Sequence, residues 1–210
     1  MRKIDYSGWD DIETVVEKIN EVTLQISQAM VLLEKHGNYV QMIYDLFDNL
    51  ESTLDYWTGN TYVGIEKEEE LKNAYQGLFE CLFRFVLLCQ KVSDPVLNDF
   101  AKSVLFQGTV YRYLGHGFHD ESITQRIIPR YDGIFVSWSK VPQNTYLENK
   151  LYGTITKLTC LIDNEYYGID LEPFGVVRGD ESEVVFPTIE QTIKSIEYIE
   201  DESDEDSTFQ

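Results

Sequence analysis

Two glutamates near the end of the chain have the spacing of a catalytic carboxylate pair. Glu181 and Glu183 are separated by one serine, and the sequence then changes at once to the apolar run Val-Val-Phe-Pro. In an extended segment their side chains lie on one face, about 7 Å apart. Such a pair can divide the work of stabilising a cation and handling a proton. Taken alone, the same residues are better explained as a solvated acidic turn.

A second stretch places two hydroxyls beside an aromatic ring. Residues 135–139 read Phe-Val-Ser-Trp-Ser. Because side chains alternate along a strand, Phe135, Ser137 and Ser139 share one face. Two hydroxyls and a ring then line the same space. Serines that face water at a strand edge are the simpler alternative.

A third stretch holds one arginine in an apolar, aromatic strand. Arg112 lies between Tyr111 and Tyr113. A half-buried guanidinium needs a partner, and its planar fork suits a carboxylate or a phosphate. By itself, this position is better explained by a structural ion pair with one of the many acidic residues.

Together and in this order, the three stretches resemble the arginine–serine–glutamate signature of the mono-ADP-ribosyltransferases. That family has an arginine on an early strand after a block of helices, then a Ser-x-Ser strand led by an aromatic residue, and last a Glu-x-Glu turn that enters an apolar strand. Arg112, Ser137 and Glu183 take these places, 25 and 46 residues apart. The motifs cover roughly residues 106–190. The residue between the serines is Trp138, where threonine is commoner in the family.

The resemblance implies a role for each residue. Glu183 would bind the ribose next to nicotinamide and stabilise its cationic transition state, and Ser137 would orient Glu183. Arg112 would hold NAD by its phosphates or ribose and brace the site. Glu181 would orient the acceptor, and a glutamate there goes with a protein arginine as acceptor. The remaining NAD contacts that the resemblance implies are Tyr113, Phe135, Trp138 and Ser139. Phe135 and Trp138 are equally well explained as core residues.

The chemistry agrees with these roles. Breaking the bond between nicotinamide and ribose builds positive charge on the sugar, as glycoside hydrolysis does. A fixed carboxylate beside that charge stabilises the transition state more than the ground state. The resemblance therefore predicts transfer of ADP-ribose from NAD to a macromolecule. An NAD glycohydrolase and a non-catalytic acidic interaction protein on a degenerate transferase scaffold are the alternatives.

Other segments allow weaker interpretations. Residues 172–178 are the candidate for a loop that recognises the acceptor, with Phe174 exposed, although an ordinary loop explains them at least as well. His116 and a downstream Tyr146 resemble elements of the poly(ADP-ribose) polymerase and diphtheria-toxin branch, which ranks below the Glu-x-Glu branch. His116 and His119 are better explained by a turn than by a metal site, because no third ligand is evident.

The elements that must position these residues fall into two halves. Apolar residues three and four apart predict a first helix that Ser7 caps and Gly37 follows, about 8–36, and further helices at about 39–57 and 66–89. Asp94-Pro95 opens a fourth helix that runs to about residue 105. From Gly108 on, short β-rich runs predict strands at 109–114, 133–138, 153–162, 168–171 and 183–186, whereas 188–199 is ambiguous between strand and helix. We therefore expect an α+β fold with a helical layer packed on a split mixed sheet and NAD between them. The expected regions are a helical one at 1–105, in the same domain as a β core at 106–199, and a disordered acidic tail at 200–210.

Charge and composition narrow the class of protein. The 210 residues have a net charge of −20, and six of those negative charges lie in 200–206. A surface this negative disfavours generic binding to nucleic acid or to anionic membranes. The sequence has neither an apolar run of about 20 residues nor a secretory signal at its start, so we expect a cytoplasmic protein, of the producing or a host cell. A host target or an antitoxin is a possible partner, as for a small toxin or effector, and no metal is expected.

Overall fold

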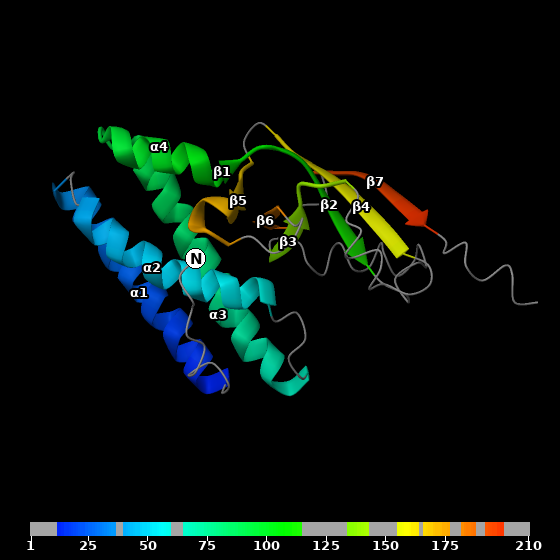
Figure 1. Ribbon diagram of the computed structural model, residues 1–210, viewed down its shortest axis with the longest axis horizontal. Coiled ribbons are helices and arrows are strands. Elements are labelled where there is room, and N and C mark those ends of the chain that lie inside the picture. The colour runs from blue at the N-terminus through cyan, green and yellow to red at the C-terminus, as the bar shows by residue number, and fades with distance from the viewer. Residues whose placement is uncertain are drawn as a thin grey trace, which may run out of the picture. The chain divides into compact units, whose positions relative to one another are not determined.

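Four amphipathic helices form the first half of the chain (Figure 1). The structure is a computed structural model that describes residues 12–36, 40–59, 65–114, 134–142, 155–163, 166–176, 182–187 and 192–199. The helices are α1 (Ile12–His36), α2 (Val40–Gly59), α3 (Ile65–Lys91) and α4 (Pro95–Val104). Helix α1 packs against α2 and α3, and α3 packs against α4. The predicted inner face of α1 is confirmed, since its residues from Val15 to Leu33 at spacings of three and four are buried.

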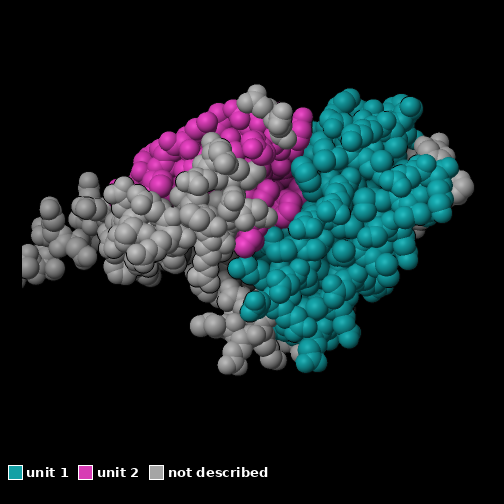
Figure 2. Space-filling view, turned by 180° about the vertical axis from the view of Figure 1, so that it is seen from behind, with its two compact units in different colours: residues 1–105, 171–176 teal, residues 106–170, 177–210 magenta. Residues whose placement is uncertain are grey.

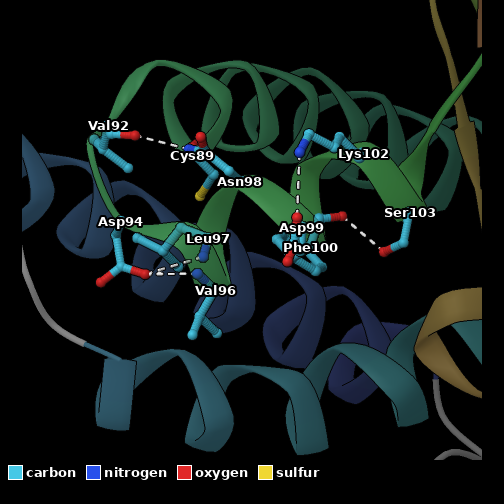
Figure 3. A network of polar contacts seen from close by, with 10 residues as sticks. All are labelled: Cys89, Val92, Asp94, Val96, Leu97, Asn98, Asp99, Phe100, Lys102 and Ser103. Atoms are coloured by element: carbon cyan, nitrogen blue, oxygen red, sulfur yellow. Dashed lines mark hydrogen bonds and ion pairs between the residues drawn. The ribbon is translucent and has the colours of Figure 1, made fainter.

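The turn between α3 and α4 is held by side chains that satisfy backbone groups (Figure 3). The Asp94 carboxylate accepts from the amides of Val96 and Leu97, at 2.9 and 3.2 Å, and Pro95 occupies the first turn, where its missing N–H costs nothing. From α4, the Asn98 amide donates to the carbonyls of Cys89 and Val92, at 2.9 and 2.7 Å. Both helix ends therefore have hydrogen-bond partners.

Seven strands form one antiparallel sheet in the order β1-β5-β6-β3-β2-β4-β7. The strands are β1 (Leu105–Phe106), β2 (Gly108–Leu114), β3 (Phe135–Ser139), β4 (Ile155–Ile162), β5 (Gly168–Asp170), β6 (Glu183–Pro187) and β7 (Ile193–Ile199). The α+β class is thus confirmed, whereas the expected mixed sheet is wrong, because the paired strands are antiparallel. Of the ambiguous segment at 188–199, residues 193–199 form a strand.

The sheet is nearly divided between β2 and β3. Seven residue pairs join β2 to β4, and five join β3 to β6. By contrast, β2 and β3 share the single pair Tyr111 and Ser139. One face of the sheet carries an apolar cluster that fills the core of this half, and its buried members are Val110, Val136, Trp138, Leu158, Cys160, Ile162, Val184 and Phe186.

The chain divides into two compact units, which Figure 2 colours separately. Unit 1 comprises residues 1–105 and 171–176, and unit 2 comprises 106–170 and 177–210. The chain thus passes from one unit to the other where the sequence pattern changes from helical to extended. No helix in the described ranges is both long enough and apolar enough to span a membrane.

The expected exposure of Phe174 is wrong. Phe174 ends the short 3-10 helix η1 (Glu172–Phe174), which belongs to unit 1, and only 6% of the residue is exposed. Its ring packs edge-on against Phe47 and Phe100, with centroids 6.1 and 5.9 Å away. Gly175 then turns the backbone with a φ of 79°, a conformation that other residues rarely adopt. The aromatic packing makes Phe174 a core residue and rules it out as an exposed contact for an acceptor.

Replacing the α4 cap should destabilise the protein. Asp94→Ala removes the acceptor for two helix-end amides, so we expect the free energy of unfolding to fall by about 1 kcal/mol in urea denaturation. Asp99→Ala is the matched control, because it removes an exposed pair with Lys102 (3.2 Å) that is worth about 0.5 kcal/mol or less. An equal or larger loss in the control would contradict the capping role.

The buried thiol of Cys89 should make stability fall at alkaline pH. Burial raises the pKa of Cys89 from 9.0 to about 12. Above pH 9 the unfolded chain therefore loses this proton while the folded chain keeps it, and stability falls as the pH rises. Between pH 8 and 10, wild type should lose about 1 kcal/mol more than Cys89→Ala in denaturant titrations. Parallel pH profiles for the two proteins would refute this assignment.

Candidate active site

One face of the sheet in unit 2 carries the predicted serine and glutamate side chains. Ser139 pairs with Glu183 on one side and with Tyr111 on the other, so these three side chains share a face. By strand alternation, Ser137 and Tyr113 lie on the same face. The apolar cluster around Trp138 occupies the opposite face. We call the face of Ser137, Ser139 and Glu183 the polar face, although the buried Val185, which pairs with Ser137, and Ile169 also lie on it.

Ser137 and Glu183 are in direct contact. The Ser137 hydroxyl donates a hydrogen bond to Oε1 of Glu183, although the two residues are 46 positions apart in the chain. Ser137 lies diagonally across from Glu183, two residues along β3 from its direct partner, a distance that a glutamate side chain spans. Only 9% of Glu183 is exposed. Burying a carboxylate is costly unless hydrogen bonds satisfy it, so this contact both stabilises and orients it.

The backbone just before Glu183 is tied to the end of β3. The Lys140 amide donates to the Ser182 carbonyl at 2.9 Å. The Lys140 ammonium forms an ion pair with Asp170 of β5 at 2.7 Å, and both side chains are largely buried. One residue therefore joins the adjoining ends of β3, β5 and β6, and it holds the first residue of β6 in place.

Arg112 contacts Ser137 through the backbone. Its Nη1 donates to the Ser137 carbonyl at 3.0 Å. By alternation, Arg112 starts from the core face of β2, opposite to the Ser137 hydroxyl. Its contact lies beyond the single residue pair that joins β2 to β3, where the two strands form no further ladder. The guanidinium thus bridges the two strands there. This contact suits the expected bracing role, while contact with NAD stays a prediction.

Two aromatic residues of the expected NAD site lie on the polar face. The Tyr113 hydroxyl donates to the Pro142 carbonyl, and 9% of Tyr113 is exposed. Phe135 is 7% exposed and shares its face with Ser137. Both therefore share a face of the sheet with Ser137, and both are largely buried.

The other two expected NAD contacts are used elsewhere. Trp138 is 2% exposed and belongs to the core cluster, so the core interpretation of this residue is the one that its position supports. The Ser139 hydroxyl accepts from the Val141 amide at 3.1 Å and also lies 3.3 Å from the Val141 carbonyl. It thereby closes the turn after β3 and is buried at 7% exposure. An aromatic contact with a ligand at Glu183 would come from Phe135 rather than from Trp138.

Several predicted residues lie outside the described part of the chain. These are Glu181, His116, His119, Tyr146 and the acidic tail at 200–210. Within the described residues, no group of three or more histidine, cysteine, aspartate or glutamate side chains could hold a metal ion.

Sequence reasoning missed the lysine that shares the polar face. Lys157 pairs with Tyr113 across β2 and β4, and its ammonium lies over the Tyr111 and Tyr113 rings, 5.2 and 5.9 Å from their centroids. Strand periodicity alone shows that Lys157 points to the face opposite to that of Thr156 and Leu158. Which face it joins depends on the pairing of β4 with β2, and no local signal in the sequence gives that pairing.

In comparisons with family models, curated proteins and solved structures, no match to this chain was found.

Removing the Ser137 hydroxyl should destabilise the protein more than removing the hydroxyl of a half-buried serine that donates to an exposed glutamate. Ser137→Ala leaves a buried carboxylate with one donor fewer, and we expect a loss of about 1–3 kcal/mol in the free energy of unfolding. Ser195→Ala is the matched control, since Ser195 donates to the exposed Glu197 at 3.1 Å, and we expect a change within about 0.5 kcal/mol. Equal losses in urea denaturation would show that the Ser137 contact adds nothing.

Proposed function

We propose that this protein is a mono-ADP-ribosyltransferase that moves ADP-ribose from NAD to a macromolecular acceptor, a protein arginine. The observation that carries the proposal is the contact between Ser137 and the buried Glu183, braced through the Ser137 carbonyl by Arg112. These are the three residues that the family signature marks, and they come from three different strands. Their meeting supports the resemblance independently of the spacing along the chain.

Glu183 supplies the electrostatic part of the reaction. As the bond between C1′ of the ribose and the nicotinamide nitrogen breaks, its electron pair leaves with nicotinamide and positive charge develops on the ribose. The Glu183 carboxylate beside C1′ stabilises that charge. Because Glu183 is 9% exposed, little water screens it, and its effect on the transition state is larger than at a surface.

Ser137 and Arg112 keep that carboxylate in one position. The Ser137 hydroxyl fixes one carboxylate oxygen, and Arg112 fixes the Ser137 backbone, so Glu183 does not need to reorganise as charge develops. A buried carboxylate that is already oriented is what cation stabilisation requires. In this proposal, Phe135 on the same face packs against nicotinamide.

The acceptor half of the reaction belongs to Glu181. Its carboxylate, two residues before Glu183, orients an arginine guanidinium whose nitrogen attacks C1′ and then releases a proton. An acidic protein of net charge −20 attracts such a cationic target. This part of the proposal rests on the Glu-x-Glu resemblance alone.

Replacing Glu183 by its amide should slow the reaction strongly while keeping the shape of the side chain. Incubated with labelled NAD and a cell lysate, wild type should label protein, and Glu183→Gln should be slower by about 100-fold or more, because transition-state charge stabilisation is lost. Glu197→Gln is the control, since Glu197 is an exposed glutamate on β7 and should leave the rate unchanged.

The products separate the alternatives. Label on protein that depends on Glu183 supports the transferase. Free ADP-ribose without labelled protein supports an NAD glycohydrolase instead. If wild type leaves NAD intact, both enzyme assignments fail and a non-catalytic interaction protein becomes the better account.

A further inference from the structure

Binding NAD poses an electrostatic problem for this chain, and the inference drawn from it rests on the proposed function. The diphosphate of NAD is anionic, and the protein has a net charge of −20. A surface of that charge repels an anion unless a cation lies at the binding site. Some basic side chain near Glu183 must therefore face the diphosphate.

The described part of unit 2 holds four basic residues: Arg112, Lys140, Lys157 and Lys194. Arg112 donates to the Ser137 carbonyl, and Lys140 is paired with Asp170. Lys194 is exposed on the edge strand β7. Lys157 lies on the polar face, and its ammonium contacts aromatic rings.

The Lys157 side chain lies against two aromatic rings rather than against a described carboxylate. Its ammonium lies 5.2 Å from the Tyr111 ring centroid and 5.9 Å from that of Tyr113, and among the described carboxylates none forms an ion pair with it. A cation–π contact orients an ammonium without neutralising it, unlike the carboxylate that pairs with Lys140. The two tyrosine rings therefore hold the positively charged Lys157 ammonium in a defined position.

The register places that charge on the face of the candidate site. Tyr113 lies directly opposite Lys157, and it shares its face with Ser137 on β3. At the one residue pair that joins β2 to β3, two strand spacings of about 4.8 Å put β4 about 10 Å from β3, and the separation is at least that large near Ser137 and Lys157, where β2 and β3 are not paired. In NAD, the diphosphate is attached to the 5′ carbon of the ribose that Glu183 would bind. A dinucleotide with that ribose at Glu183 can therefore extend its diphosphate over Tyr113 toward β4.

We propose that Lys157, held over Tyr111 and Tyr113, binds the diphosphate of NAD and so positions the ADP-ribose half of the substrate. The ammonium makes charge-assisted hydrogen bonds to phosphate oxygens. Lys157 acts on binding rather than on bond breaking, because it lies two strands away from the Ser137–Glu183 contact.

The test measures binding and turnover separately in the full chain. For Lys157→Gln, we expect the Kd of ADP-ribose, measured by calorimetry, and the KM for NAD each to rise about tenfold, with kcat within about twofold of wild type. Lys157→Arg restores the charge and should bring both values back to within about threefold of wild type. The KM of wild type should also rise more steeply with salt than that of Lys157→Gln.

Lys194→Gln is the matched control, since it removes an exposed lysine of the same unit and should leave Kd and KM unchanged. If Lys157→Gln lowers the melting temperature, Lys157→Met is used instead, because it keeps the apolar stem over the rings. The same rise in Kd and KM is expected for it. Wild-type affinity for ADP-ribose in a folded, uncharged variant would overturn the inference while leaving the proposed function intact. Failure of wild type to bind ADP-ribose or consume NAD would overturn both.

Discussion

A buried carboxylate in a strongly acidic protein is the constraint on which the candidate site depends. Glu183 is nearly enclosed, in a chain whose net charge already opposes another buried negative group. Because little water reaches the Glu183 carboxylate, hydrogen bonds from the protein must stabilise its negative charge. The Ser137 hydroxyl is one such donor, and its position follows from the register of β3 on β6. The pairing of these two strands therefore decides whether the site exists.

The weak junction between β2 and β3 gives Arg112 its place. A continuous ladder would occupy the Ser137 carbonyl with a backbone amide of β2, whereas a single residue pair leaves the guanidinium to meet it. The Arg112 side chain thus supplies a hydrogen bond between β2 and β3 that the backbone does not form. Because the Arg112 side chain spans β2 and β3, it also couples the two halves of the sheet. A ligand bound across both strands would therefore depend on the position of each half.

Much of the fold follows from local patterns, and much of the site does not. The helices and most strands were predictable because their apolar residues recur at the spacing that each structure requires, as on the buried face of α1. The shared face of Ser137 and Ser139 follows from alternation in the same way. The antiparallel order of the sheet, the burial of Phe174 and the place of Lys157 depend on contacts between distant segments. Phe174 is instructive, since a residue between proline and glycine has the pattern of an exposed loop, yet two phenylalanines enclose it.

The anchoring of β6 has a consequence for how such a protein could change its target. The Lys140 amide donates a hydrogen bond to the carbonyl of Ser182, immediately before Glu183. Under the proposed function, the residues just before Ser182, with Glu181 among them, can therefore vary without moving the buried carboxylate, whereas β5 further upstream is itself paired with β6. Under the proposed function, acceptor choice would lie on one side of Ser182 and cleavage of NAD on the other. Evolution can then change the choice of acceptor while the cleavage of NAD stays the same. The backbone hydrogen bond from Lys140 to Ser182 marks the boundary between these two functions.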